Sequence, residues 1–163
     1  LLDGWSKTYA MTGWRMGYSV WPASIVDKVR KLAVNCWSCV NAPAQFAGLA
    51  ALTGPQDAVY EMVAEFDRRR KVVVEEVNRL PGVSCATPKG AFYAFPNITA
   101  TGWKAKPLAS ALLEEAGVAA IGGPDFGVHG EGYIRLSYAN STENIRRAIE
   151  RIGAFLAENA KAA

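Results

Sequence analysis

The chain has 163 residues, 50% of them hydrophobic and 20% charged, which is the balance of a globular domain long enough to bury a core. Its net charge of +3 is too small to argue for nucleic-acid binding, and no apolar run approaches the length of a membrane span. Three cysteines without a secretory signal predict a reducing, cytoplasmic setting.

The first 21 residues predict two strands, 1–3 and 15–21, with a reversal of the chain near residues 11–13. Such a reversal would bring Lys7 and Arg15 to the same level, facing one pocket. A lysine amine can form an imine with an aldehyde, and an arginine binds a phosphate in a bidentate way. The stretch therefore suits a ligand that carries both groups.

Two helices are predicted next. Apolar residues at helical spacing predict a helix over 23–34, with Ser24 as the candidate N-cap. Residues 44–53 are small and apolar, which predicts a closely packed, buried helix that ends at Gly54.

Cys36 and Cys39 have the C-x-x-C spacing of redox and zinc sites. A redox motif would need a preceding strand and a helix at the second cysteine, and zinc would need two further ligands. Only Cys85 and His129 remain, far away in the sequence. We interpret the cysteines as structural, and a zinc assay tests the alternative.

A long helix is predicted over 56–80, about 37 Å in length. That length suits a bridge between two domains, so we expect one domain over 1–80 and a second over 81–163. The basic run at 68–71 fans around the helix axis, which favours a solvated face over a nucleic-acid patch.

The second domain is predicted to combine short strands with two helices. The helices start at Pro107 and at a Ser141 or Thr142 cap. The predicted strands are residues 83–86, 91–96, 118–121 and 133–140.

The glycine-rich stretch 122–132 lacks the G-x-G-x-x-G spacing of a dinucleotide site and precedes a strand rather than a helix. We expect a loop. His129, the only histidine, is interpreted as a loop residue rather than a catalytic group.

Along 133–140, apolar Ile134, Leu136 and Tyr138 alternate with polar neighbours, which predicts one buried and one open face. Arg135 stands on the open face. An arginine at mid-strand either faces solvent or points into a site where an anion neutralises it, and the spacing alone leaves both alternatives open.

The string at residues 6–18, SKTYAMTGWRMGY, resembles the lysine segment of the class I and II aminotransferases, which are fold type I enzymes that use pyridoxal 5'-phosphate. Segments 90–96 and 133–140 resemble two further stretches of that family. The resemblance implies that Lys7 is catalytic and forms the Schiff base with the cofactor. It also implies that Arg15 binds the cofactor phosphate and that Arg135 binds the substrate carboxylate, with no metal.

The resemblance further implies an α/β fold, of which this chain would be the C-terminal half. The end of a large parallel-sheet domain would precede a small α+β domain. An amino acid and a 2-oxo acid would be the substrates, with broad aspartate-type or similar specificity. A homodimer or higher homo-oligomer is expected, and activity is expected to require the missing N-terminal half.

The sequence departs from the family at two places. Gly4 stands where many relatives have a phosphate-binding serine, and residues 122–124 read Gly-Gly-Pro where relatives often have Pro-Gly-Ser. Two other functions stay open at this stage. One is a fold type I lyase or decarboxylase, and the other is a non-catalytic remnant that self-associates.

Overall fold

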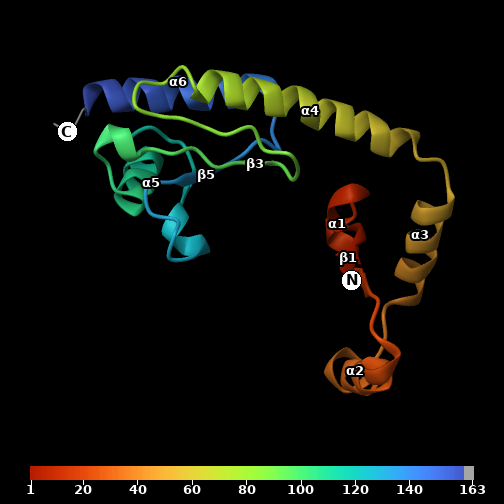
Figure 1. Ribbon diagram of the computed structural model, residues 1–163. Helices are drawn as coiled ribbons and strands as arrows, with labels where there is room; N and C mark the ends of the chain where they lie inside the picture. Colours follow the sequence, from red (N-terminus) through yellow and green to blue (C-terminus); the bar gives the residue numbers. More distant parts are fainter. Residues whose placement is uncertain (160–163) are drawn as a thin grey trace. The chain divides into compact units, whose positions relative to one another are not determined.

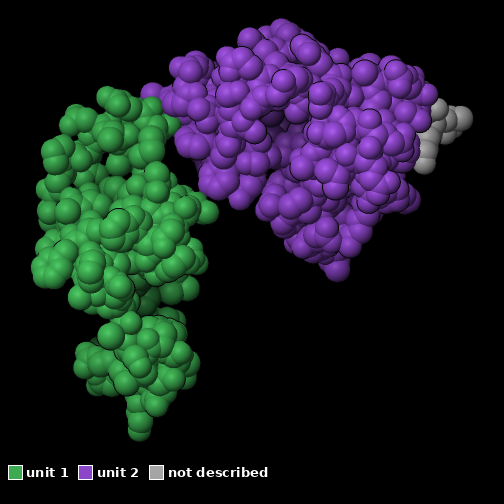
Figure 2. Space-filling model, turned by 180° about the vertical axis from the view of Figure 1, so that it is seen from behind, with its two compact units in different colours: residues 1–62 green, residues 63–163 purple. Residues whose placement is uncertain are grey.

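The computed structural model describes residues 1–159, which form two compact units. The first unit comprises Leu1–Met62 and the second begins at Val63, so the division falls inside helix α4 (Asp57–Val77). Figure 2 shows the two units in different colours. The predicted boundary at residue 80 stays a prediction.

The first unit begins with a two-stranded antiparallel ribbon, in which Leu2 pairs with Ser19 and Gly4 pairs with Gly17. This pairing confirms the reversal of the chain near residues 11–13. The elements of the first unit are β1 (Leu2–Gly4), α1 (Trp5–Thr8), the 3-10 helix η1 (Thr12–Trp14), β2 (Gly17–Ser19), α2 (Ala23–Trp37), α3 (Ala42–Thr53) and the start of α4.

Strand β2 starts two residues later than predicted. Arg15 has φ of 54°, a left-handed conformation that ends η1 and does not belong to a strand. The sequence carries no glycine there to signal such a turn, since the nearest glycines are Gly13 and Gly17.

Two expectations for α2 are wrong in detail. The helix runs three residues beyond position 34, so Cys36 is helical. Ser24 is not the N-cap, because Pro22 occupies that position without a side-chain hydrogen bond. The fixed φ of Pro22, here −56°, sets the chain direction at the helix start and places Ser24 inside the first turn.

Helix α3 is confirmed, but its predicted burial is wrong. Only Ala44 and Gly48 are buried, whereas Phe46 is 74% exposed and Leu49 and Leu52 are more than half exposed. Within residues 1–159, the other sides of this mostly apolar helix have no element packed against them closely enough to bury them.

The second unit is a three-stranded antiparallel sheet in the order β3-β5-β4, with α4 and α6 on one side (Figure 1). Beyond α4, its elements are β3 (Tyr93–Ala94), the 3-10 helix η2 (Thr99–Thr101), α5 (Ala105–Glu114), β4 (Ile121–Gly122), the 3-10 helix η3 (Gly123–Phe126), β5 (Ile134–Ser137) and α6 (Thr142–Glu158).

The core of this unit lies between the sheet and its helices. Ile134, Leu136 and Tyr138 are buried, which confirms the predicted alternation along β5. Helix α6 buries a stripe of apolar side chains that includes Ile145, Ile149 and Ile152, and Ser141 caps it by accepting a hydrogen bond from Asn144 N at 3.1 Å. Each fully buried Ile or Leu contributes about 1.5–3 kcal/mol of transfer free energy.

Helix α4 is shorter than predicted, with 21 residues and therefore about 31 Å of length. Its basic run pairs with acids one turn earlier: Arg70 lies 2.6 Å from Asp67, and Lys71 lies 2.7 Å from the same carboxylate. The side chains of Arg68 and Lys71 are 68% and 70% exposed, which confirms the solvated face for these two residues, whereas those of Arg69 and Arg70 are only 22% and 24% exposed. The ion pairs have i,i+3 and i,i+4 spacing. They also lower the pKa of Asp67, through the hydrogen bonds from Lys71 and Arg70.

The predicted strand over 83–86 is wrong, since it is reduced to one bridge between Ser84 and Asn97. Asn78, the residue after α4, takes its place as a partner. The Asn78 side chain accepts a hydrogen bond from Cys85 N at 2.8 Å and donates one to Cys85 O at 3.0 Å. An amide side chain thus satisfies backbone groups that a longer strand would have paired.

Among residues 1–159 no helix combines the length and the apolar character needed to cross a membrane.

Candidate active site

The segment around Lys7 is fixed by Trp5. The indole Nε1 of Trp5 donates a hydrogen bond to Gly48 O of α3 at 3.1 Å. The Trp5 ring packs edge-on against that of Tyr18, with the ring centroids 5.1 Å apart. A Cβ on Gly48 would lie 3.2 Å from the Trp5 ring, so the glycine allows this close approach. Trp5 therefore anchors the short helix α1 that carries Lys7.

Lys7 and Arg15 both lie on the connection between β1 and β2, and both side chains are exposed. Arg15 Nη1 donates to Thr12 O at 3.0 Å, which orients the guanidinium and leaves its other N–H groups for a ligand. Arg15 lines an open pocket of about 560 Å³ together with Trp14, Tyr18 and Asn41. Lys7 does not line that pocket.

Asp3 gives this pocket a negative group beside the arginine. Tyr18 OH donates a hydrogen bond to Asp3 Oδ2 at 3.3 Å, and the charge of Asp3 raises the pKa of the Tyr18 phenol above its usual value. Tyr18 therefore stays a neutral hydrogen-bond donor at physiological pH.

Gly4 shows why a serine is not simply interchangeable here. A Cβ at Gly4 would lie 3.0 Å from Met16 O and 3.4 Å from Gly17 Cα, across the pair that Gly4 and Gly17 form in the ribbon. A side chain would require the two strands to separate by a few tenths of an ångström. A serine at this position would thus need a small local rearrangement of the ribbon.

Arg135 lies in the second unit, on the face of the sheet opposite the core. Its guanidinium carbon is 4.3 Å from the centroid of the Tyr93 ring and 4.3 Å from that of Phe126. Within residues 1–159, the Arg135 side chain forms no ion pair and no hydrogen bond. Its N–H donors are therefore available for an anion.

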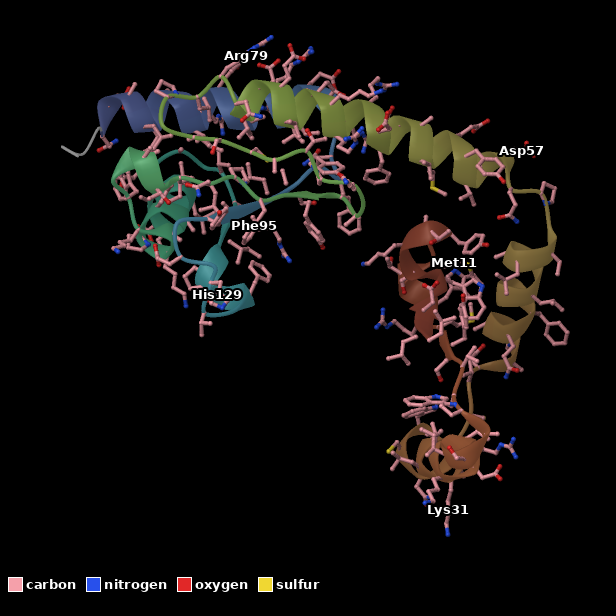
Figure 3. All side chains as sticks on the ribbon, in the orientation of Figure 1. Met11, Lys31, Asp57, Arg79, Phe95 and His129 are labelled. Atoms are coloured by element: carbon pink, nitrogen blue, oxygen red, sulfur yellow. The ribbon has the colours of Figure 1, made fainter. Side chains whose placement is uncertain are left out.

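The aromatic partners extend on both sides of Arg135. Phe95 is labelled in Figure 3. Its ring stacks on that of Tyr133, with the centroids 5.2 Å apart, and packs edge-on against that of Phe126, with the centroids 6.1 Å apart. Tyr93 in turn contacts Phe92 at 4.4 Å. Sequence reasoning assigned no chemistry to these rings. The sequence did contain an indication of this cluster. Residues 93 and 95 are two apart, as are 133 and 135, and this spacing places all four side chains on one face of the sheet.

Phe126 is held by a loop whose ends cross at two glycines. A Cβ on Gly123 would lie 2.0 Å from Gly130 O, and a Cβ on Gly130 would lie 2.0 Å from Gly123 O. Gly123 N also donates to Tyr133 O at 2.7 Å. The stretch predicted as a loop therefore contains η3, whose last residue is Phe126, on a fixed base.

The cysteines and His129 do not converge. Cys36 and Cys39 are exposed and Cys85 is buried, which raises the pKa of the Cys85 thiol. His129 is exposed in the loop after η3 (Figure 3). No three His, Cys, Asp or Glu side chains within residues 1–159 are grouped so that they could hold a metal ion.

Comparison with known proteins identifies the family. The family model for aminotransferase class I and II matches residues 1–152. An aspartate aminotransferase of Pyrococcus horikoshii is 44% identical over 154 residues, which are 93% of this chain and 39% of that protein. An aromatic-amino-acid aminotransferase of Thermococcus litoralis is 38% identical and matches 96% of this chain and 41% of its own length.

Solved structures give the same result. The aromatic aminotransferase from Pyrococcus horikoshii matches with a TM-score of 0.92 at 42% identity, over 96% of this chain and 42% of that one. The aspartate aminotransferase from Rhizobium meliloti matches with a TM-score of 0.89 at 36% identity, over 96% of this chain and 41% of that one. The α/β fold is thus that of part of a fold type I aminotransferase. The chain spans about two fifths of these relatives' length and belongs to the class I and II aminotransferase family.

Proposed function

We propose that this chain is the C-terminal part of a pyridoxal-phosphate-dependent aminotransferase, which exchanges an amino group between an amino acid and a 2-oxo acid. The observation that carries the proposal is Arg135, whose guanidinium has two aromatic contacts but no carboxylate partner among residues 1–159. A half-buried arginine without a counter-ion suits a site that is neutralised by a bound carboxylate.

The residues near the start of the chain fit the cofactor by the chemistry of their groups. Lys7 offers an amine that would hold the aldehyde carbon, and Arg15 offers N–H groups for the phosphate. Pyridoxal phosphate, when bound, supplies an aldehyde for the amino group and a ring that delocalises the charge left at the substrate Cα.

Each residue then has one task. Lys7 would take the proton from the substrate Cα as a general base and would then donate it, as a general acid, to the carbon that carried the aldehyde. Arg15 would keep the phosphate in place, with Thr12 O fixing its orientation. Arg135 would bind the α-carboxylate with two parallel N–H donors, which orients the Cα–H bond for proton removal.

The first experiment maps the lysine that reacts. The purified chain is mixed with pyridoxal phosphate and reduced with borohydride, and its peptides are analysed by mass spectrometry. We expect the adduct at Lys7, and Lys7→Arg to abolish it while Lys31→Arg, in an exposed lysine of α2, has no effect. Equal labelling of the exposed lysines would contradict the assignment and favour a non-catalytic protein.

The second experiment asks whether the chain is sufficient. Because it spans about two fifths of its relatives' length, we propose that it does not catalyse steady transamination alone. The assay supplies aspartate, 2-oxoglutarate and pyridoxal phosphate and follows oxaloacetate. Sustained product formation by the purified chain would contradict this proposal. Release of elimination or decarboxylation products would favour the lyase alternative instead.

We also propose that the chain self-associates, as a homodimer or higher homo-oligomer. Phe46, Leu49 and Tyr60 are each more than half exposed, which leaves apolar surface on α3 and the first turn of α4. Sedimentation velocity tests this proposal. Phe46→Glu is expected to shift the chain toward the monomer, whereas Val128→Glu, at a 91% exposed position of the second unit, is not.

A further inference from the structure

Arg135 occupies one place in a continuous row of side chains on the open face of the sheet. The row consists of Tyr133, Phe95, Phe126, Arg135 and Tyr93, and the ring centroids and guanidinium carbon of neighbouring members lie between 4.3 and 6.1 Å apart. Its members come from three segments, because η3 contributes Phe126 to residues supplied by strands β3 and β5 and the chain beside them.

The two rings that contact Arg135 are held by different means. Tyr93 is in β3 and pairs with Ser137, diagonally across from Arg135, so the sheet fixes it. Phe126 ends η3 and is 49% exposed, but the crossing of Gly123 and Gly130 fixes the base of its loop. Neither ring is needed to bury the core, which lies on the other face.

We propose that Tyr93 and Phe126 are positioning residues that hold the Arg135 guanidinium in place before a carboxylate binds. An exposed arginine samples many rotamers, and a ligand that binds it must order the side chain. The guanidinium carbon lies over both rings, 4.3 Å from each centroid, and no hydrogen bond within residues 1–159 occupies the N–H groups that would bind the two oxygens of a carboxylate. We call these two rings the ring clamp.

The ring clamp rests on the proposed function of Arg135, since only a carboxylate-binding arginine gains from it. It makes a separate claim, however, about how the binding affinity arises. Each ring is expected to contribute about fivefold to the affinity, the factor given by a partly exposed cation–π contact.

The test uses nuclear magnetic resonance of the full 163-residue chain, with pyruvate as the carboxylate probe at constant ionic strength. In the unmodified chain the Arg135 Hε signal is expected upfield of its unperturbed position, because the rings lie over the guanidinium. Pyruvate is expected to shift this signal in a saturable way. Arg147, an exposed arginine of α6 whose Nη2 donates to Asn144 Oδ1 at 2.6 Å, serves as the reference in the same sample.

Three variants separate the ring clamp from general effects on the fold. Phe126→Leu keeps an apolar side chain of similar size, and we expect it to remove most of the upfield shift and to weaken pyruvate binding about fivefold. Phe126→Tyr keeps the ring and is expected to restore both values. Phe46→Leu, on α3 of the other unit, is the matched control and is expected to change neither.

The outcomes distinguish the two claims. If Phe126→Leu loses the upfield shift but binds pyruvate as tightly as the unmodified chain, the ring clamp is overturned and the proposed role of Arg135 stands. The absence of an upfield shift in the unmodified chain also overturns the clamp. If the shift is present but pyruvate causes no change at Arg135, the carboxylate role fails, and the positioning role fails with it.

Discussion

At the scale of single residues, Gly123 and Gly130 make a backbone contact that leaves no room for a side chain at either position. A Cβ at either glycine would meet the carbonyl oxygen of the other at 2.0 Å. Real Cβ atoms do not approach a backbone oxygen so closely, and a carbonyl cannot rotate aside as the end of a long side chain can. The pair therefore sets the geometry of the loop that carries Phe126.

Gly123→Ala is predicted to lower the free energy of unfolding by roughly 3 kcal/mol, the upper end of the cost of overpacking. Urea unfolding followed by circular dichroism measures it. Gly90→Ala is the matched control, because a Cβ there meets nothing within 4 Å, and its effect is expected within about 0.5 kcal/mol. Equal stability of the two variants would show that the loop base can shift.

The sequence indicated which face of β5 carries Arg135 but not which side chains surround it. Arg135 was placed on the open face of its strand because a period of two decides which residues share a face. Phe126 could not be assigned as its neighbour, since seven residues and two turns separate it from β5. The left-handed Arg15 was also missed, because only the hydrogen bond to Thr12 O and the ribbon register reveal why a non-glycine residue adopts that conformation.

At the scale of elements, helix α5 begins with a capping group from a distant segment. Glu131 Oε1 accepts hydrogen bonds from Ala105 N at 2.9 Å and from Gly132 N at 3.2 Å. Lys104, at the N-cap position, supplies no side-chain hydrogen bond. Glu131 therefore ties the helix start to the end of the loop, and its negative charge lies at the positive end of the helix dipole.

This cap predicts a pH dependence of stability. The bond from Ala105 N–H, followed by that from Gly132 N–H and the charge of Lys104, lowers the pKa of Glu131 below its usual value despite partial desolvation. A carboxyl group whose pKa is lower in the folded state stabilises the fold above its unfolded pKa of about 4.3. That stabilisation is lost as the pH falls through the folded pKa.

The stability advantage of the unmodified chain over Glu131→Gln is therefore predicted to shrink as the pH is lowered from neutral to below the carboxyl range. Urea unfolding at a series of pH values measures it. Glu114→Gln, at the exposed end of the same helix, is the control. Parallel stability curves for the unmodified chain and Glu131→Gln would contradict the capping role.

Helices were predicted more accurately than strands, for a physical reason. A helix closes its hydrogen bonds within one segment, so periodicity and a cap such as Ser141 suffice to locate α6. Strands β3 and β4 have two residues each because pairing with β5 ends there, and pairing depends on a partner far away in the sequence. The composition of α3 predicted its helix but could not indicate which of its faces are covered.

At the scale of the whole molecule, the two units differ in the core that supports them. The second unit has a continuous cluster in which α4, α5, α6 and β5 all bury apolar side chains. In the first unit, α2 buries no residue, and α3 buries only Ala44 and Gly48. A helix without buried side chains loses little when it opens, so local unfolding costs less free energy there.

Hydrogen exchange is predicted to follow this difference. Amides of α6 are expected to exchange at least about tenfold more slowly than those of α2, the factor for a difference of about 1.4 kcal/mol in opening free energy. Mass spectrometry of peptides after timed labelling measures both helices in one sample. Comparable protection of α2 at low protein concentration would contradict the prediction, and protection that appears only at high concentration would indicate association.

The glycine crossing also divides the loop into parts that differ in their freedom to vary. Residues 124–129 lie between the crossing points, and Val128 and His129 among them are exposed. Insertions and exchanges of sequence are best tolerated at such exposed loop positions. For a protein engineer, the exposed tip at Val128 and His129 is thus the part of this loop that can be exchanged, while Phe126 must be kept for its contact with Arg135. A library that varies position 123 or 130 would consist mostly of misfolded members.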